Sequence, residues 1–448
     1  MEFYFDVLIL SIGFVLIFRT LVSNRVVNVL LSIFFITSIM QILFVGYKWQ
    51  YVPIYLIFII ISFLHIFNIK FDKKFFKIGY YILIIVIYGI CVALVYILPV
   101  PEFEIENKKY SVGYEEFHVV VSDRKQPQAF YELSNLTSTS SRELLVDVYY
   151  PSAAETEPIQ LFKDADTNWG KTVVRYLNRT WGISLPEYLL SHLNLSYFDI
   201  GRDLEKLDNK SPVVIYTHGW AGEKIFATDQ LITIASQGYV VVALDHTGLA
   251  MFTELPSGTI YNTGATENSS KVYDVMYEMS LDIENTISYL ENNNYYANFS
   301  DISLIGHSTG GGSAHLYCLR NNCNSLILQD PLFVPLLEEI GTIDLVTDSY
   351  FIYSENWYNG NEDINELTEI EVYRNYVTNK DLANGYYLTE SAHYDFVAFG
   401  VISPLAKYTF LKGRIDYKDS LQANNRFNLE SLKLKSITTD NLIYEIQK

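Results

Sequence analysis

The chain has 448 residues, of which half are hydrophobic and 19% are charged, and its formal net charge is −19 at pH 7. The charges are unevenly spread, because residues 1–100 hold seven basic and three acidic residues, whereas the remainder holds 25 basic and 48 acidic ones. This length predicts two parts, and the strongly acidic second part excludes a nucleic-acid partner, which is a polyanion of the same sign.

The first hundred residues contain four apolar runs, at about 3–20, 27–47, 51–69 and 78–100. Each run approaches the roughly 20 residues that a helix needs to cross ~30 Å of hydrocarbon. A signal peptide would instead show one short run before a cleavage site. The pattern therefore predicts that residues 1–100 form four transmembrane helices with the lipid bilayer as their partner.

Basic residues in the short loops predict the orientation of these helices. The loop between the third and fourth runs, residues 70–77, is the most basic on the chain, and Arg19 and Arg25 flank the first loop. Loops rich in Lys and Arg stay in the cytoplasm. We therefore expect the N-terminus and everything after Val100 to be extracytoplasmic, although Lys48 falls on the outer side against this rule.

After a linker at residues 101–112 the pattern changes to short β-branched stretches that alternate with helical spacing. The expected strands are 116–121, 144–149, 213–217, 239–244, 301–305, 325–329 and 349–354, and the expected helices include 228–237, 270–292, 310–320 and 416–435. Such alternation predicts a mostly parallel sheet flanked by helices. We expect this α/β domain to span residues 113–436, followed by a tail at 437–448.

One segment, at about 155–205, interrupts that alternation. It is rich in apolar and aromatic residues, such as Trp169, Trp181 and Tyr188. A lid that faces the substrate and a helix packed on the edge of the sheet both fit this composition, and the sequence leaves the two open.

The strongest chemical signal is the motif Gly306-His307-Ser308-Thr309-Gly310, which lies between an expected strand and an expected helix. In a nucleophile elbow the turn is so tight that only glycine fits two residues before and after the serine. The turn places the serine oxygen above the sheet and beside a helix N-terminus, where backbone N–H groups stabilise an oxyanion. We therefore predict that Ser308 is a nucleophile in an α/β-hydrolase fold.

Chain order then selects the partners of this serine, because this fold places the acid and then the histidine after the nucleophile. Only His315 and His393 follow Ser308, and His315 lies within the helix that starts at the elbow. His393 is therefore the expected base. Asp330 and Glu355 each follow an expected strand directly, and position favours Asp330 while it leaves Glu355 as an alternative acid.

The second half of an oxyanion hole is expected in the turn that follows the strand 213–217. The sequence Thr217-His218-Gly219-Trp220 supplies a His-Gly turn of the kind that these enzymes use. The expected donors are the backbone N–H groups of Trp220 and Thr309.

The three cysteines give neither a disulfide framework nor the spacing of metal ligands. Cys318 and Cys323 lie five residues apart, and we interpret them as ordinary helix residues in preference to a disulfide pair. We expect no metal and no cofactor.

Together these motifs resemble the platelet-activating factor acetylhydrolase family of isoform II type, over about residues 110–432. The resemblance includes 148–152, 217–220, 238–246, 306–308, 328–331, 391–393 and 413–416. It implies calcium-independent hydrolysis of esters, with short or oxidised acyl chains of phospholipids as substrates, and it selects Asp330 as the acid. Thr309 replaces an aromatic residue of the family and 245–247 replace a more basic turn. We expect both to line the acyl pocket.

The resulting expectation is a membrane-anchored serine esterase that acts on (phospho)lipid or other acyl esters outside the cytoplasm. One alternative makes the helices the functional part, as a sensor or scaffold whose hydrolase domain binds a ligand. The other keeps the fold and changes the bond, giving a peptidase or an esterase of the cell envelope.

Overall fold

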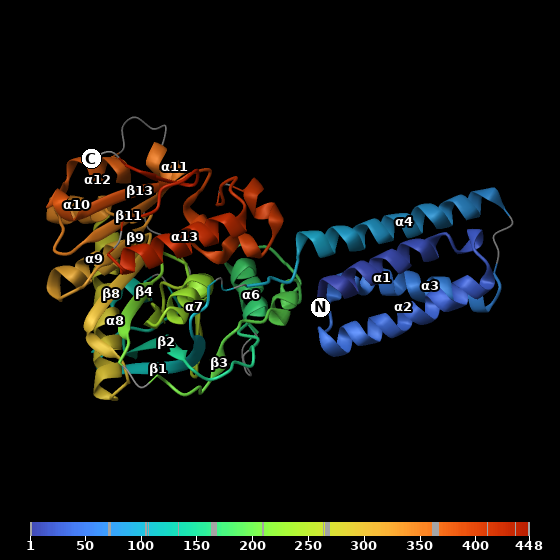
Figure 1. Cartoon of the computed structure of the whole chain (residues 1–448), viewed down its shortest axis with the longest axis horizontal. Helices are drawn as coiled ribbons and strands as arrows, with labels where there is room; N and C mark the ends of the chain where they lie inside the picture. The colour runs from blue at the N-terminus through green and yellow to red at the C-terminus, as the bar shows by residue number, and fades with distance from the viewer. Residues whose placement is uncertain are drawn as a thin grey trace.

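The computed structural model describes residues 2–69, 73–103, 105, 107–132, 134–162, 168–207, 210–262, 264, 269–360, 367–409, 411–434 and 436–446. Figure 1 shows two parts: a bundle of N-terminal helices, drawn in blue, extends away from a domain in which helices cover both faces of a sheet. The two parts are joined at the end of α4.

The bundle consists of α1 (Glu2–Ile17), α2 (Asn24–Phe44), α3 (Val52–Ile66) and α4 (Lys74–Ile97). Among the described residues, three segments are long and apolar enough to cross a membrane: Asn24–Phe44, Trp49–Ile66 and Lys74–Ile97. The expectation of four spanning helices is thus too high by this measure, because α1 has only 16 residues. At 1.5 Å per residue such a helix is about 24 Å long, which is shorter than the ~30 Å of a hydrocarbon core.

Within the described residues, ten strands form one sheet in the order β14-β13-β11-β9-β8-β4-β5-β2-β1-β3. Their bounds are Ser111–Lys125 (β1), Ser141–Ser152 (β2), Gly201–Arg202 (β3), Pro212–Thr217 (β4), Val240–Asp245 (β5), Asn298–His307 (β8), Leu326–Gln329 (β9), Ser349–Ser354 (β11), Ala383–Leu388 (β13) and Ile443–Glu445 (β14). The strands from β13 to β5 run parallel. Because the carboxyl ends of parallel strands meet at one edge, the residues that follow β4, β8, β9, β11 and β13 gather there.

Alternation along the central strands explains why both faces of the sheet are covered. On β4, Val213 and Ile215 belong to one hydrophobic core and Val214 and Tyr216 to another, and all four side chains are buried. Successive side chains of a strand point to opposite faces, so a continuous apolar run needs helices on both sides. The first core includes residues of α8 (Ser269–Asn292), α9 (Thr309–Arg320) and α10 (Val334–Ile340), and the second includes residues of α7 (Thr228–Ser236) and α13 (Tyr417–Leu432).

The seven strands expected from the sequence are confirmed, but β3 and β14 were not anticipated, and β14 lies in the segment expected to be a tail. Strand β13 was not anticipated either. Its sequence, ANGYYL, contains Asn and Gly, which are depleted in strands. The glycine has a local reason, because a Cβ on Gly385 would overlap the ring of Tyr373. Tertiary packing against β11 therefore outweighs the weak local propensity.

The described part of the insert contains α6 (Trp169–Trp181), which packs on the domain. Trp169, Val173 and Val174 are buried in the same core as α7, and Trp169 Nε1 donates a hydrogen bond to Glu223 Oε2 over 2.6 Å. Of the two alternatives for this segment, the packed helix describes α6. Residues 163–167 lie outside the described residues.

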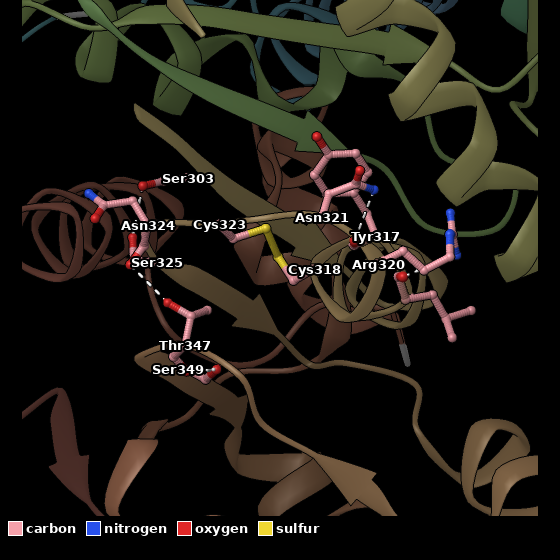
Figure 2. Close-up of a disulfide and its surroundings, with 11 residues drawn as sticks. Ser303, Tyr317, Cys318, Arg320, Asn321, Cys323, Asn324, Ser325, Thr347 and Ser349 are labelled. Atoms are coloured by element: carbon pink, nitrogen blue, oxygen red, sulfur yellow. Dashed lines mark hydrogen bonds between the residues drawn. A yellow bond between two sulfur atoms is a disulfide. The ribbon is translucent and has the colours of Figure 1, made fainter. Parts of the chain in front are cut away.

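The structure contradicts the interpretation of Cys318 and Cys323 as unpaired helix residues. Figure 2 shows a disulfide between them, with Cα atoms 5.5 Å apart. Helix α9 ends at Arg320, and the chain then turns back toward β9, so Cys323 lies beside the last turn of the helix. The expected helix at 310–320 matches α9, and the error was to count Cys323, which lies in the loop after it, as a helix residue.

Direct contacts connect the bundle to the insert. The indole of Trp49, just before α3, donates from Nε1 to the carbonyl oxygen of Leu189 over 3.2 Å. Its ring also packs on Tyr188 with centroids 5.4 Å apart. The loop between α2 and α3 therefore touches the same segment that carries α6.

Candidate active site

Ser308 lies in the tight turn between β8 and α9. Its backbone has φ 58° and ψ −125°, a conformation that residues with a side chain rarely adopt. A Cβ on Gly306 would overlap the carbonyl group of Gly310, and a Cβ on Gly310 would overlap the carbonyl oxygen of Thr217. Only glycine therefore fits at positions 306 and 310 of the motif, as the sequence analysis expected. The turn directs Ser308 to the carboxyl edge of the sheet.

Asp330 and His393 meet at the same edge, although 63 residues separate them. Asp330 follows β9 and is fully buried, and its Oδ2 lies 3.1 Å from Nδ1 of His393. The backbone N–H and the hydroxyl of Ser354 donate to the two carboxylate oxygens over 2.6 and 2.7 Å. Because the carboxylate accepts from Nδ1, the Nε2 atom of His393 is left as the proton acceptor.

Glu355, the alternative acid, is engaged in another role. Its carboxylate accepts a hydrogen bond from the backbone N–H of Glu390 over 2.5 Å, and its own N–H donates to Ser391 Oγ over 3.1 Å. Both contacts fasten the loop that carries His393. The geometry therefore pairs Asp330 with His393 and gives Glu355 a positioning role.

The imidazole of His393 is held between two other rings. Trp357, on α11 (Glu355–Asn359), stacks on it with centroids 4.4 Å apart and an interplanar angle of 9°. His307 packs at 4.5 Å and 32°, and its Nε2 donates to the carbonyl oxygen of His393 over 2.9 Å. An aromatic face stabilises a cation above it, so Trp357 is suited to stabilise an imidazolium.

Burial makes a charge costly on either member of the Asp330–His393 pair. It lowers the pKa of His393 to about 3 and raises the pKa of Asp330 to about 7, while the hydrogen bonds from Ser354 oppose the rise for Asp330. Protons taken up by such a close pair belong to the pair and not to one residue. The pair therefore gains its first proton near pH 7 as the pH falls.

The turn after β4 lies against Ser308. A Cβ on Gly219 would be 2.7 Å from Cβ and 3.3 Å from Oγ of Ser308. The Gly219 carbonyl accepts from Nδ1 of His218 over 2.7 Å and from the N–H of Gly222 over 3.0 Å. That carbonyl and the N–H of Trp220 belong to one peptide plane, so these two bonds fix the direction of the expected oxyanion donor.

The turn at 245–247 does not line a pocket as the sequence analysis expected, because all three residues are buried and bonded internally. Asp245 pairs with Lys224 over 2.7 Å. His246 lies between Thr217 (2.8 Å) and Asp282 (3.0 Å), and Asp282 also pairs with the fully buried Arg142 over 2.5 Å. This charged network replaces the expected pocket wall and supports the strand end that carries Thr217.

Other site residues gave weaker signals in the sequence. Thr309, the second expected oxyanion donor, is the first residue of α9 and is buried. Ser354 and Trp357 were not anticipated, because a serine at a strand end and a tryptophan in a five-residue helix carry no motif. Among the described residues, no group of three His, Cys, Asp or Glu side chains is arranged to hold a metal ion.

A nucleophile elbow, an acid–histidine pair after it and a mostly parallel sheet beneath them define an α/β-hydrolase fold. A solved structure described as a ferulic acid esterase from Streptomyces cinnamoneus has the same fold, with a TM-score of 0.59 and 17% sequence identity. The alignment covers 78% of this chain and 100% of that one.

The family model described as platelet-activating factor acetylhydrolase, isoform II, matches residues 111–257. The family resemblance drawn from the motifs is thus confirmed over that segment, which ends before Ser308. A search of curated proteins gave no match.

Proposed function

We propose that this protein is a serine esterase that hydrolyses carboxylic esters through an acyl-enzyme. The observation that carries the proposal is the Asp330–His393 pair at the sheet edge that also bears Ser308 in its strained turn. The family match and the esterase of the same fold support this reaction class.

The proposed reaction has two steps, acylation of Ser308 and hydrolysis of the acyl-enzyme, and both use the same residues. Ser308 Oγ attacks the ester carbonyl while its proton passes to Nε2 of His393, and the N–H groups of Trp220 and Thr309 stabilise the oxyanion. Collapse of the tetrahedral intermediate breaks the ester bond, and the alcohol leaves with the proton from His393. Water, deprotonated by the same imidazole, then attacks the acyl-enzyme and releases the acid.

We further propose that the bundle anchors the enzyme in a membrane with its α/β domain outside the cytoplasm. The basic residues Arg19, Arg25, Lys73, Lys74 and Lys77 flank one end of the helices, and the domain follows the other end. The Cys318–Cys323 disulfide supports the same side, because disulfides persist in oxidising compartments.

The substrate class that fits this anchor is a lipid ester, with short or modified acyl chains as the family resemblance implies. The anchor would keep the site close to substrates that reside in the bilayer. Profiling hydrolysis of p-nitrophenyl esters, phospholipids and peptides against acyl-chain length distinguishes this class from a peptidase or from an esterase of cell-envelope acyl groups.

Labelling with a fluorophosphonate probe tests the nucleophile directly. The full chain should be labelled, and Ser308→Ala should not be labelled although it remains folded. Ser313→Ala is the matched control, because Ser313 lies on α9, five residues after Ser308, but is fully buried. Equal labelling of wild type and Ser308→Ala would reject the proposed nucleophile.

A further inference from the structure

A cavity of about 140 Å³ is lined by residues from the first turns of α1, the loop before α3 and the end of α4. These ends of the helices lie next to the α/β domain (Figure 1). The lining of the cavity combines polar and apolar residues: Asp6, Lys48, Gln50, Val95, Leu98, Pro99, Val100 and Glu102. The chain leaves α4 along this lining and continues into the α/β domain. The cavity therefore lies where the bundle joins the α/β domain. Its lining residues belong to other elements than those that carry Ser308.

An ion pair at the cavity accounts for the basic residue that the orientation rule left on the outer side. The Lys48 side chain is 4% exposed, and its Nζ lies 3.1 and 3.2 Å from the two carboxylate oxygens of Asp6. Glu102 adds a second carboxylate on the exposed rim. Among the described residues of the lining, Lys48 offsets the charge of Asp6, and the additional carboxylate of Glu102 favours a ligand with a cationic group.

Gln50 gives an independent indication of a ligand. Its side chain is 1% exposed, and its Nε2 donates to the carbonyl oxygen of Leu98 over 2.9 Å. Among the described residues its Oε1 has no hydrogen-bond partner. Buried carbonyl oxygens are nearly always paired, because an unpaired one loses its hydration without compensation. A ligand that donates N–H groups would remove this cost.

We propose that this cavity binds the headgroup of a membrane lipid that carries a primary ammonium. The N–H groups donate to Gln50 Oε1 and to the Glu102 carboxylate. The proposal rests on the membrane placement of the bundle, since the end of a spanning helix lies at the level of the headgroups. Val95 and Leu98 then face the part of the acyl chains that is next to the headgroup.

Lipids that differ only in their N–H groups test this assignment. The full chain is placed in nanodiscs of phosphatidylcholine, or in discs where part of it is replaced by phosphatidylethanolamine with the same acyl chains. The unfolding midpoint of the wild type should rise by about 2–5 °C with the ethanolamine lipid, since a ligand of the folded state raises the midpoint. N-methylated and N,N-dimethylated ethanolamine lipids should give progressively smaller rises, because each methyl group removes one donor. Equal midpoints in both discs would overturn the proposal.

Matched variants locate the effect. Gln50→Leu should abolish the rise in the unfolding midpoint. Glu102→Gln should reduce it, and because Glu102 is exposed, this variant tests the site even if Gln50→Leu misfolds. Asn28→Leu is the control, because Asn28 is an amide of α2 whose Oδ1 binds Nε2 of His65 away from the cavity. A full rise in Gln50→Leu would refute the site.

Soluble O-phosphoethanolamine, added to phosphatidylcholine discs, identifies the source of the ammonium. A full rise with this compound would assign the cavity to a free amine and overturn the lipid. Fluorophosphonate labelling in the same discs reports on Ser308 alone. Failure of the lipid site and failure of the esterase are therefore distinguishable.

Discussion

Substituting alanine for Gly219 tests whether the turn after β4 forms part of the catalytic site. The added Cβ would lie 2.7 Å from Ser308 Cβ and 3.2 Å from the carbonyl oxygen of His307. An ordinary contact begins near 3.4 Å, so either the turn or Ser308 must move by about 0.7 Å. In an active site a misplacement of ~1 Å costs about 100-fold in rate. Loss of an oxyanion donor costs a similar factor of ~10²–10³ in kcat.

The assay is kcat and KM for a p-nitrophenyl ester, measured together with the unfolding midpoint. We expect Gly219→Ala to lower kcat by about 100-fold with a small change in KM, because the misplaced groups act on the transition state. Gly89→Ala is the matched control, because a Cβ on Gly89 meets nothing within 4 Å. A variant Gly219→Ala that keeps kcat within about threefold would refute the placement of this turn beside the reacting atoms.

Asp330→Asn should lower kcat by about 10³–10⁴-fold. Glu355→Gln should keep kcat within about tenfold, because Glu355 only fastens the loop that carries His393. Steady-state kinetics of both variants would show the reverse order if the acids were misassigned. For the wild type, log(kcat/KM) should fall with unit slope below about pH 7, where the buried pair takes up its first proton; a profile that stays flat to pH 5 would contradict this pairing. Trp357→Leu should lower kcat by about tenfold, since it removes the aromatic face from the imidazolium of His393, and Trp357→Phe should restore most of it. Cys323→Ser should lower the free energy of unfolding by about 2 kcal/mol, the entropy of a six-residue closed loop, and a reducing agent should destabilise the wild type by the same amount in urea titrations.

The parts of the site that could be predicted are those fixed by chain order and local sterics. The elbow around Ser308 follows from two glycines between a strand and a helix, and the relative places of Asp330 and His393 follow from the order of strands in this fold. These inferences needed no knowledge of long-range contacts. The seven expected strands were found for the same reason, since their apolar runs reflect burial on both faces.

What could not be predicted depends on contacts between distant residues. The stacking of Trp357 on His393 and the hydrogen bonds of Ser354 exist only once β9, β11 and β13 lie side by side. The buried position of His246 likewise requires Asp282, 36 residues away. The sequence does not distinguish a residue at a strand end that faces a pocket from one that faces a buried ion. The turn at 245–247 was therefore wrongly expected to line the acyl pocket.

The left-handed backbone at Ser308 and Asp330, with φ of 58° and 42°, has a consequence for how this chain can evolve. Such conformations cost about 1–3 kcal/mol each, out of a total stability of about 5–15 kcal/mol for a typical domain. A lineage that no longer needed Ser308 could therefore gain stability through Ser308→Gly, whereas Asp330→Gly would leave the buried donors of Ser354 unpaired and lose what it gained. Substitutions in the surrounding core would be tolerated more readily in that lineage than in an active enzyme.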